Sequence, residues 1–345
     1  MKLLQVLAVP AALTLVAACG GGSTPGASPS TAASPSSSAA TGARPVRQTT
    51  AQPPAMVGVT GRGSLVLLSS ASGAPVRTLV RGGVIGDEIS VAADGQTIYF
   101  SRRHGCVDDV ESVAVSGGKP TLITTGSLPA ISPDGSTLAF ARQPTLTKHC
   151  LSGGSGDLSA QYSLVTRTLS SGVERAYPML PAGQSSGLPA PISHLSWAAN
   201  GTELAVSIAA IQDNEGWQIM LMDTATAQNY LGGTGDTPVP VTGPDRRRSY
   251  WREGVYLPGG NLFVSRACCA GEPVRNVSKL MWEITPAGVL RHRVAIGFPG
   301  LDHTSLAVNR SGKWLLYLAG TGLYVSEKGA RPRQVGSGLI AASWL

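Results

Sequence analysis

The sequence has few charged or aromatic side chains and no clear amphipathic helix. Charged residues make up 14% of the 345 positions and aromatic residues 5%, whereas there are 43 glycines and 24 prolines. The best helical candidate, residues 217–227, alternates in a way that fits a strand equally well. After residue 18, no apolar run reaches the roughly 20 residues that a membrane-spanning helix needs. Short apolar runs between turn residues dominate instead, and they favour an all-β fold.

Motifs of common catalytic and metal sites are also missing. The sequence contains no EF-hand loop, P-loop or G-x-G-x-x-G turn, and no histidine pair with ligand spacing. The G-x-S-x-G match at 183–187 is flanked by proline-rich loop sequence, not by the strand and helix of a nucleophile elbow. We therefore predict a protein that is not an enzyme, with no catalytic residue, metal or cofactor. We expect the histidines to be polar groups in loops or at strand ends; they are His104, His149, His194, His292 and His303.

The first residues have the composition of an export signal. Met1-Lys2 supplies a positive start, and residues 3–18 are mostly apolar or small. The end of this segment, Val16-Ala17-Ala18-Cys19, resembles the lipobox of bacterial lipoproteins. The resemblance implies that 1–18 is a lipoprotein signal peptide, that Cys19 carries the lipid, and that the protein is anchored on the extracytoplasmic face of the cell membrane. An ordinary cleaved signal is the alternative.

Residues 19–54 form a linker of glycine, serine, threonine, alanine and proline. The segment cannot bury enough apolar surface to offset its conformational entropy, so we predict that it is disordered. A flexible chain of this length spans on the order of 30 Å. This length suits a tether that holds a folded domain, residues 55–345, away from a lipid surface.

An internal repeat carries the fold prediction. Each copy has an apolar strand, a turn ending in glycine, and a second apolar strand. The copies are 89–102, 130–142, 195–207, 254–266 and 306–318, with aligned glycines Gly95, Gly135, Gly201, Gly259 and Gly312. Two more candidate strands follow each pair, for example 111–115 and 120–124, and four strands make one propeller blade.

The copy at 130–142 contains Ser132-Pro133-Asp134-Gly135 between its two strands. These repeats resemble the TolB-like, WD-type propeller family over nearly all of 55–345. The resemblance implies a β-propeller, which hosts many functions and so implies little about activity. In the fourth copy Pro258-Gly259 replaces Asp-Gly, which leaves its turn type open.

The two ends of the domain supply a sixth blade. Residues 338–345 resemble a first strand without its successors, and 55–60, 64–69 and 75–80 resemble three strands without a first. Pairing the ends removes exposed strand edges. We therefore predict a six-bladed propeller in which 339–344 pairs with 55–60.

Four cysteines follow Cys19, and export favours disulfides between them. They are Cys106, Cys150, Cys268 and Cys269. The repeat alignment puts Cys106 and Cys150 in adjacent blades, so we predict that these two pair and that Cys268 and Cys269 form a vicinal pair. Free buried thiols are the alternative.

Charged residues suggest one functional face, formed by the loops between second and third strands and between blades. Arg102, Arg142 and Arg266 lie seven residues after their aligned glycines, and we predict that they edge an anion-attracting ring. Salt bridges to neighbouring strands are the alternative. A basic–aromatic patch at 246–252 includes Arg247 and Trp251. Acidic clusters, expected in loops, are Asp108, Asp109 and Glu111, and Asp213, Asn214 and Glu215.

The sequence thus predicts a lipid-anchored extracytoplasmic propeller that binds a protein or an anionic envelope polymer. The net charge of +7 is compatible with anionic partners. Export argues against nucleic acid, and we expect a monomer. The alternatives are a lyase-type propeller enzyme and a small-ligand sensor, both of which use the central channel. A polar or titratable cluster lining that channel favours these alternatives.

Overall fold

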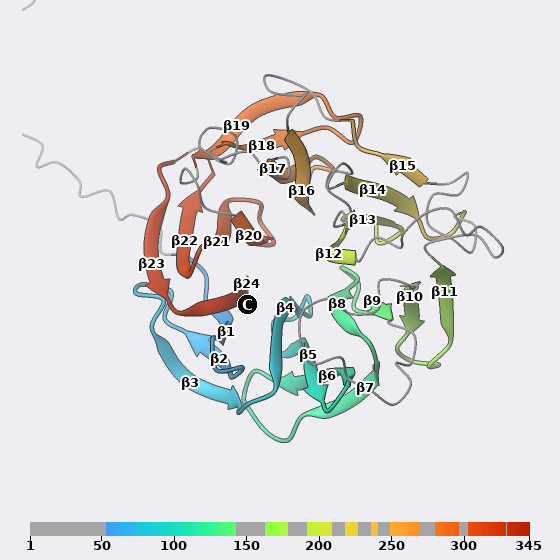
Figure 1. Cartoon of the computed structure of the whole chain (residues 1–345), viewed down its shortest axis with the longest axis vertical. Coiled ribbons are helices and arrows are strands. Elements are labelled where there is room, and N and C mark those ends of the chain that lie inside the picture. The colour runs from blue at the N-terminus through green and yellow to red at the C-terminus, as the bar shows by residue number, and fades with distance from the viewer. Residues whose placement is uncertain are drawn as a thin grey trace, which may run out of the picture. The chain divides into compact units, whose positions relative to one another are not determined.

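The computed structural model describes residues 53–142, 163–178, 192–208, 218–226, 236–240, 249–268, 280–296, 303–328 and 330–345. These ranges contain only strands and turns. They form six sheets of four strands each, arranged around a central axis (Figure 1). The described ranges contain no helix that is both long and apolar enough to cross a bilayer. The all-β, six-bladed propeller predicted from the repeats is confirmed.

In each blade the strand nearest the axis is given first. Blade 1 contains β24 (Leu339–Trp344), β1 (Met56–Thr60), β2 (Leu65–Leu68) and β3 (Pro75–Val80). Blade 2 contains β4 (Val84–Val91), β5 (Thr97–His104), β6 (Val107–Ala114) and β7 (Thr121–Thr125). Blade 3 contains β8 (Ser127–Ile131), β9 (Thr137–Arg142), β10 (Ser163–Thr168) and β11 (Glu174–Pro178).

The second half of the ring repeats this order. Blade 4 contains β12 (Ile192–Trp197), β13 (Glu203–Ile208), β14 (Gln218–Asp223) and β15 (Asp236–Pro238). Blade 5 contains β16 (Ser249–Tyr256), β17 (Leu262–Cys268), β18 (Leu280–Ile284) and β19 (Leu290–Ile296). Blade 6 contains β20 (His303–Val308), β21 (Trp314–Ala319), β22 (Gly322–Glu327) and β23 (Arg333–Ser337).

The ring closes non-covalently in blade 1. Strand β24, from the C-terminal end, is antiparallel to β1, with Met56 opposite Trp344 and Gly58 opposite Ala342. The predicted pairing of 339–344 with 55–60 is therefore confirmed. Closure matters because an unpaired β1 would expose a strand edge and one side of its sheet.

Glycine turns join the first and second strands of blades 2 to 6. Gly95, Gly135, Gly201 and Gly312 have positive φ, and each donates its N–H to the carbonyl three residues earlier. In blade 5 this role belongs to Gly260 (φ 83°), so the alignment on Gly259 is wrong by one residue. The turn is also one residue shorter, because Leu257 N–H bonds to Asn261 O. Most side chains are disfavoured at this φ, which explains the glycine.

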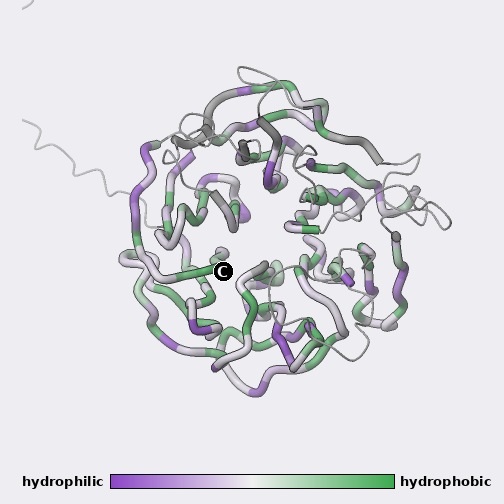
Figure 2. The backbone as a smooth tube through the Cα atoms, in the orientation of Figure 1, coloured by the Kyte–Doolittle hydropathy of each residue, from purple (hydrophilic) through white to green (hydrophobic). Residues whose placement is uncertain are grey.

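The apolar core is divided among the interfaces between blades. Six clusters of buried side chains each contain residues from two neighbouring blades. Val57 of blade 1 packs with Phe100 of blade 2, for example, and Trp251 of blade 5 packs with Ile219 of blade 4. Figure 2 accordingly shows hydrophobic segments distributed around the ring. Each blade is therefore stabilised chiefly by its neighbours, and all six innermost strands are held against the axis.

Candidate functional site

The innermost strands enclose a cavity of about 650 Å³ on the propeller axis. All six blades contribute to its wall. The lining comes from 88–95, 130–133, 194–197 with 199, 255–258, 305–310 and 342–345. The cavity includes the turns between first and second strands, so it lies at the end of the channel opposite the loops that the sequence analysis favoured. Its volume falls in the range of pockets that hold one compact ligand.

One position recurs on the innermost strands, seven residues before the positive-φ glycine; we name it the floor position. In blades 2 to 6 it is occupied by Glu88, Leu128, His194, Glu253 and Ser305. Leu128 and Ser305 have φ of 56° and 52°, which is unusual for residues other than glycine. The strand pairing shifts register at or beside every one of these residues. Such bulges redirect side chains and are frequent beside functional sites.

Glu88 and His194 meet at the bottom of the cavity. Glu88 Oε2 accepts the backbone N–H of Leu195 at 3.1 Å, and Glu88 Oε1 lies 3.7 Å from His194 Nδ1. Glu88 is 8% exposed and His194 6%. The two residues come from β4 and β12, which belong to blades on either side of blade 3. Glu88 therefore ties two non-adjacent blades together beneath the cavity.

Burial lowers the pKa of His194 from its ordinary 6.5 to about 4, because the surroundings disfavour the charged imidazolium. The imidazole is therefore neutral at physiological pH. A neutral imidazole can accept or donate a hydrogen bond. The separation of 3.7 Å is also too long for a hydrogen bond between the two side chains.

Glu253 is the counterpart of Glu88 in blade 5. It is 6% exposed, and its Oε2 accepts the backbone N–H of Leu306 at 3.3 Å. Leu306 and Leu195 occupy the same position in their strands, one residue after the floor position. Unlike Glu88, Glu253 is not part of the cavity lining. The repeat thus supplies two similar buried carboxyl groups, of which only one faces the cavity.

Aromatic residues form part of the cavity wall where three innermost strands end. Trp197, Tyr256 and Trp344 all line the cavity. The indole N–H of Trp197 donates to Ala130 O at 2.9 Å, and that of Trp344 donates to Ala307 O at 3.3 Å. These bonds fix both rings against the preceding blades. Burial, reinforced by the nearby Glu203 carboxylate, raises the pKa of Tyr256.

The rim of the cavity carries one charge of each sign. Arg310 Nη1 donates to Ala93 O at 2.8 Å, which joins the turns of blades 6 and 2. Asp94 Oδ1 accepts the backbone N–H of Gln96 at 2.8 Å within its own turn. Apart from His194, the acidic and basic side chains of the described lining are those of Glu88, Asp94 and Arg310.

Arg102, Arg142 and Arg266 do occupy equivalent strand positions, as predicted. In each of these blades, one residue of the second strand pairs with the last residue of the innermost strand, and the arginine lies four residues after it. These second-strand residues are Ile98, Leu138 and Leu262. The guanidinium groups of the three arginines, however, are engaged within the protein. Arg102 lies 3.5 Å from Glu111, and Arg266 stacks 4.5 Å from the Trp251 ring at 2% exposure. The contact of Arg102 is the salt bridge to a neighbouring strand that the sequence analysis gave as the alternative, and the anion-attracting ring itself stays a prediction.

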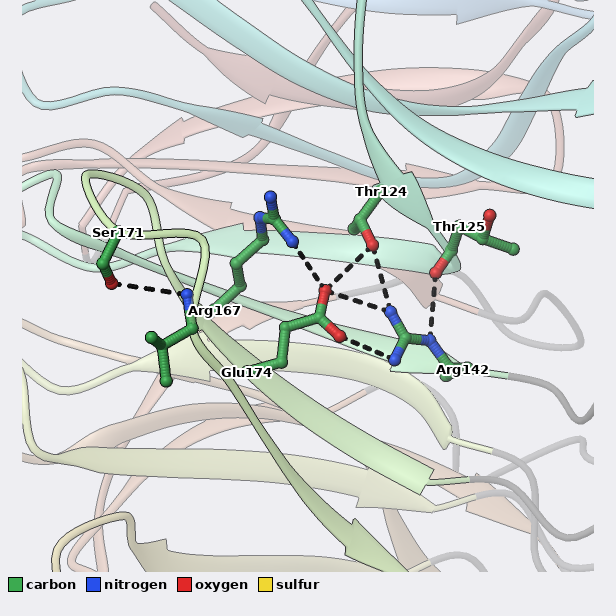
Figure 3. A network of polar contacts seen from close by, with 7 residues as sticks. Thr124, Thr125, Arg142, Arg167, Ser171 and Glu174 are labelled. Atoms are coloured by element: carbon green, nitrogen blue, oxygen red, sulfur yellow. Dashed lines mark hydrogen bonds and ion pairs between the residues drawn. The ribbon is translucent and has the colours of Figure 1, made fainter.

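Arg142 belongs to a clamp between blades 2 and 3 (Figure 3). Its Nη1 donates to Glu174 Oε2 at 2.8 Å, and its Nη2 donates to Thr124 Oγ1 at 3.0 Å. Arg167 Nη1 and the Thr124 hydroxyl donate to Glu174 Oε1 at 2.9 and 3.0 Å. The bonds from Arg142, then those from Arg167 and Thr124, outweigh burial and lower the pKa of Glu174 to about 2. The clamp is structural: it fixes β7 to β9, β10 and β11.

The predicted basic–aromatic patch needs a correction. Trp251 is fully buried in the core between blades 4 and 5, with its indole N–H on Pro240 O at 3.0 Å. A buried ring cannot contact a partner. Arg247 lies outside the described residues.

The acidic cluster near residue 110 also needs a correction, because it lies in strand β6 and not in a loop. Asp108 pairs with Arg103 at 2.7 Å, and Glu111 pairs with His104 at 3.0 Å. Residues 213–215 lie outside the described ranges. In the described part of the chain, no group of three or more His, Cys, Asp or Glu is placed to hold a metal ion.

Cys106 lies in the turn between β5 and β6 and is disulfide-bonded. Cys268 ends β17, while Cys19, Cys150 and Cys269 lie outside the described residues. The pairing of Cys106 with Cys150 therefore stays a prediction, as does the lipid on Cys19.

Sequence reasoning missed Glu88, His194 and Glu253 as a related set. A signal was nevertheless available: each interrupts an apolar strand seven residues before a turn glycine. The alignment on Gly259 concealed it, because Glu253 then falls one residue out of register.

Comparisons with known proteins show the fold. No protein-family model and no curated protein matches the chain. Among solved structures, TolB from Acinetobacter baumannii matches with a TM-score of 0.56 and 12% identity over 84% of this chain. A nidogen/laminin complex matches with a TM-score of 0.53 and 11% identity, covering 84% of this chain and 97% of that one. A putative TolB from Agrobacterium tumefaciens matches with a TM-score of 0.50 and 12% identity, covering 83% of this chain and 92% of that one.

These likenesses define the class of protein as a β-propeller similar to TolB. This chain spans 65% of the length of the Acinetobacter protein. At 11–12% identity the comparisons support a shared architecture and carry no residue-level function.

Proposed function

We propose that the chain is a lipid-anchored propeller on the outer side of a cell membrane, and that it binds an envelope protein or polymer at its central channel. The observation that carries the binding role is the cavity of about 650 Å³ to which every blade contributes. A site assembled from all six innermost strands is rigid, because each strand is held by a neighbouring core cluster. The propeller fold is compatible with a protein-binding module.

The anchor rests on Val16-Ala17-Ala18-Cys19 and on the linker composition. We expect a Cys19→Ser variant to remain unprocessed or to leave the membrane, because a lipid anchor depends on that thiol. Cell fractionation measures this directly. Cleavage at the same bond together with an unchanged membrane fraction contradicts the anchor.

Binding at the channel is tested by site-specific photo-crosslinking in isolated cell envelopes. A crosslinking residue replaces Asp94 at the cavity rim, and a matched one replaces Val76, which is 70% exposed on the outer strand β3. We expect a discrete adduct from position 94 and none from position 76. Equal adducts from both positions, or adducts only from position 76, contradict a channel site.

A second candidate is a lyase-type enzyme, and the proximity of Glu88 to His194 favours it. A neutral buried imidazole beside a carboxyl group is an arrangement used for proton abstraction. The test is degradation of uronate-containing polysaccharide by the purified protein, followed as absorbance of the unsaturated product. Turnover that disappears in His194→Gln supports an enzyme, and no turnover with any uronate polymer leaves the binding module as the function.

A further inference from the structure

Serine hydroxyls line the cavity at a second recurring position, two residues after the floor position. It is occupied by Ser90 in blade 2 and by Ser196 in blade 4. Ser343 of blade 1 is their counterpart, since it precedes a tryptophan in its strand as Ser196 does. We name Ser90, Ser196 and Ser343 the hydroxyl belt. The corresponding lining residues of blades 3, 5 and 6 are aliphatic: Ala130, Val255 and Ala307.

The hydroxyl belt has hydrogen-bonding capacity that the protein leaves unused. Ser90 Oγ accepts the backbone N–H of Ile131 at 2.9 Å, and Ser196 Oγ accepts that of Tyr256 at 3.0 Å. A hydroxyl that accepts one bond still has an O–H to donate and a second lone pair. Among the described contacts neither O–H has an acceptor, and the Ser343 hydroxyl makes no hydrogen bond. The wall therefore offers groups that can both donate to a ligand and accept from it.

His194 adds an unused polar group at the cavity floor. Its side chain is 6% exposed, and the one polar contact described for it, to Glu88 Oε1 at 3.7 Å, is too long for a hydrogen bond. A neutral imidazole has one N–H donor and one nitrogen acceptor. His194 and Ser196 are two residues apart in β12, so they face the same side of the strand about 6–7 Å apart. This spacing is comparable with that of hydroxyls on opposite sides of a sugar ring.

The acidic and basic groups of the described lining do not select an ion at this level of the cavity. Arg310 is at the rim, where its guanidinium is bonded to the carbonyl of Ala93. Asp94 is also at the rim, and its carboxylate bonds within its own turn. Glu88 is at the floor, and its carboxyl group can bond a ligand hydroxyl in either protonation state.

An entirely apolar ligand is disfavoured as well. It would leave the imidazole of His194 and the hydroxyl belt without partners in a site closed to most water, and unpaired buried polar groups cost free energy. The wall also includes the half-buried side chains of Val91, Val255 and Val308. These can contact C–H groups. A ligand that fits the whole lining therefore combines many hydroxyls with a compact hydrocarbon frame.

The geometry points to an uncharged polyhydroxyl ligand, and we propose that the cavity binds a neutral hexose, free or as part of a glycan. One sugar hydroxyl bonds the His194 imidazole, others bond the hydroxyl belt, and the C–H groups of the ring lie against the aliphatic wall. The proposal rests on the channel site of the proposed function and names its ligand. It does not depend on the lipid anchor or on a protein partner.

The test is calorimetric titration of the full chain, held in a detergent without a sugar headgroup. The probes are glucose, galactose and mannose, each as the monosaccharide and as its trisaccharide. Glucuronate and cyclohexylmethanol are the comparison ligands, because one adds a carboxylate and the other keeps a ring with a single hydroxyl. We expect saturable binding of at least one hexose probe at one site, with cyclohexylmethanol at least about tenfold weaker because several hydrogen bonds are lost.

Ser207→Ala is the matched control for Ser196→Ala. Both serines belong to β13 or β12 of blade 4, and both accept a backbone N–H from β16: Ser196 that of Tyr256 at 3.0 Å, and Ser207 that of Gly254 at 3.2 Å. Only Ser196 lines the cavity. We expect Ser196→Ala to weaken hexose binding about twofold to tenfold and Ser207→Ala to leave it unchanged. Equal losses in the two variants overturn the proposal, and thermal unfolding of both establishes that they are folded.

His194 is tested by two substitutions. His194→Leu removes both ring nitrogens and should weaken hexose binding about tenfold or more, because a donor and an acceptor are lost together. His194→Gln supplies a donor and an acceptor again and should bind more tightly than His194→Leu. Unchanged affinity in a folded His194→Leu variant contradicts the assigned role of the imidazole.

The two forms of the probes distinguish the source of the sugar. Binding of a monosaccharide assigns a free hexose or a terminal residue, and binding of trisaccharides alone assigns an internal segment of a glycan. No binding of any of these probes overturns the proposal, as does tighter binding of glucuronate or equal binding of cyclohexylmethanol. A crosslink at position 94 without sugar binding keeps the proposed function and removes this ligand. Sugar binding without a crosslink keeps this site and removes the macromolecular partner.

Discussion

The clamp around Glu174 makes the clearest stability prediction. Glu174→Gln keeps the shape of the side chain but removes the charge that Arg142 and Arg167 share (Figure 3). The lowering of the Glu174 pKa from 4.5 to about 2 corresponds to an upper limit of about 3 kcal/mol. The carboxyl group is 24% exposed, so solvent screening reduces the expected loss to about 1–2 kcal/mol.

The pH dependence follows from the direction of that shift. The folded-state pKa of Glu174 is depressed, so its contribution is present above the unfolded value of 4.5 and is lost as the pH falls toward about 2. Urea unfolding of the wild type and Glu174→Gln between pH 7 and 2 measures this. We expect the two free energies of unfolding to differ most at pH 7 and to converge as the pH approaches about 2.

Glu327→Gln provides the control, because Glu327 pairs with Lys313 at 3.2 Å on the surface, where the two side chains are 45% and 48% exposed. Exposed pairs of this kind contribute about 0–1 kcal/mol. A Glu174→Gln loss no larger than the Glu327→Gln loss, or a loss that does not change with pH, refutes the clamp as a stabilising device.

Three further results are expected. Deleting 338–345 removes β24 and should lower the unfolding midpoint of the whole domain, since β1 then has an open edge; an unchanged midpoint in thermal unfolding contradicts the closure. Gly260→Ala should cost about 1 kcal/mol or more because of its φ of 83°, whereas Gly259→Ala should cost less; urea midpoints that fall equally contradict the corrected register. His194→Gln should reduce the loss of stability as the pH falls from 6.5 toward 4, because the unfolded imidazole binds a proton there that the buried one does not; an unchanged pH profile counts against a neutral His194.

The sequence alone determined the all-β class, the repeat, the six blades and the pairing of β24 with β1. These features could be predicted because strand alternation and glycine turns are local, and five copies in register reinforce one another. The equivalent strand positions of Arg102, Arg142 and Arg266 could be predicted for the same reason.

Only the tertiary structure decided what these residues contact. Arg142 contacts Glu174 because β9 and β11 belong to the same sheet. Glu88 lies close to His194 because β4 and β12 approach each other beside β8, although the two residues are more than 100 positions apart in the chain. A repeat specifies that a residue recurs on the innermost strands but not which copies face the cavity. That choice distinguishes Glu88 from Glu253, and it depends on the bulges and on the packing of the neighbouring blades around the axis.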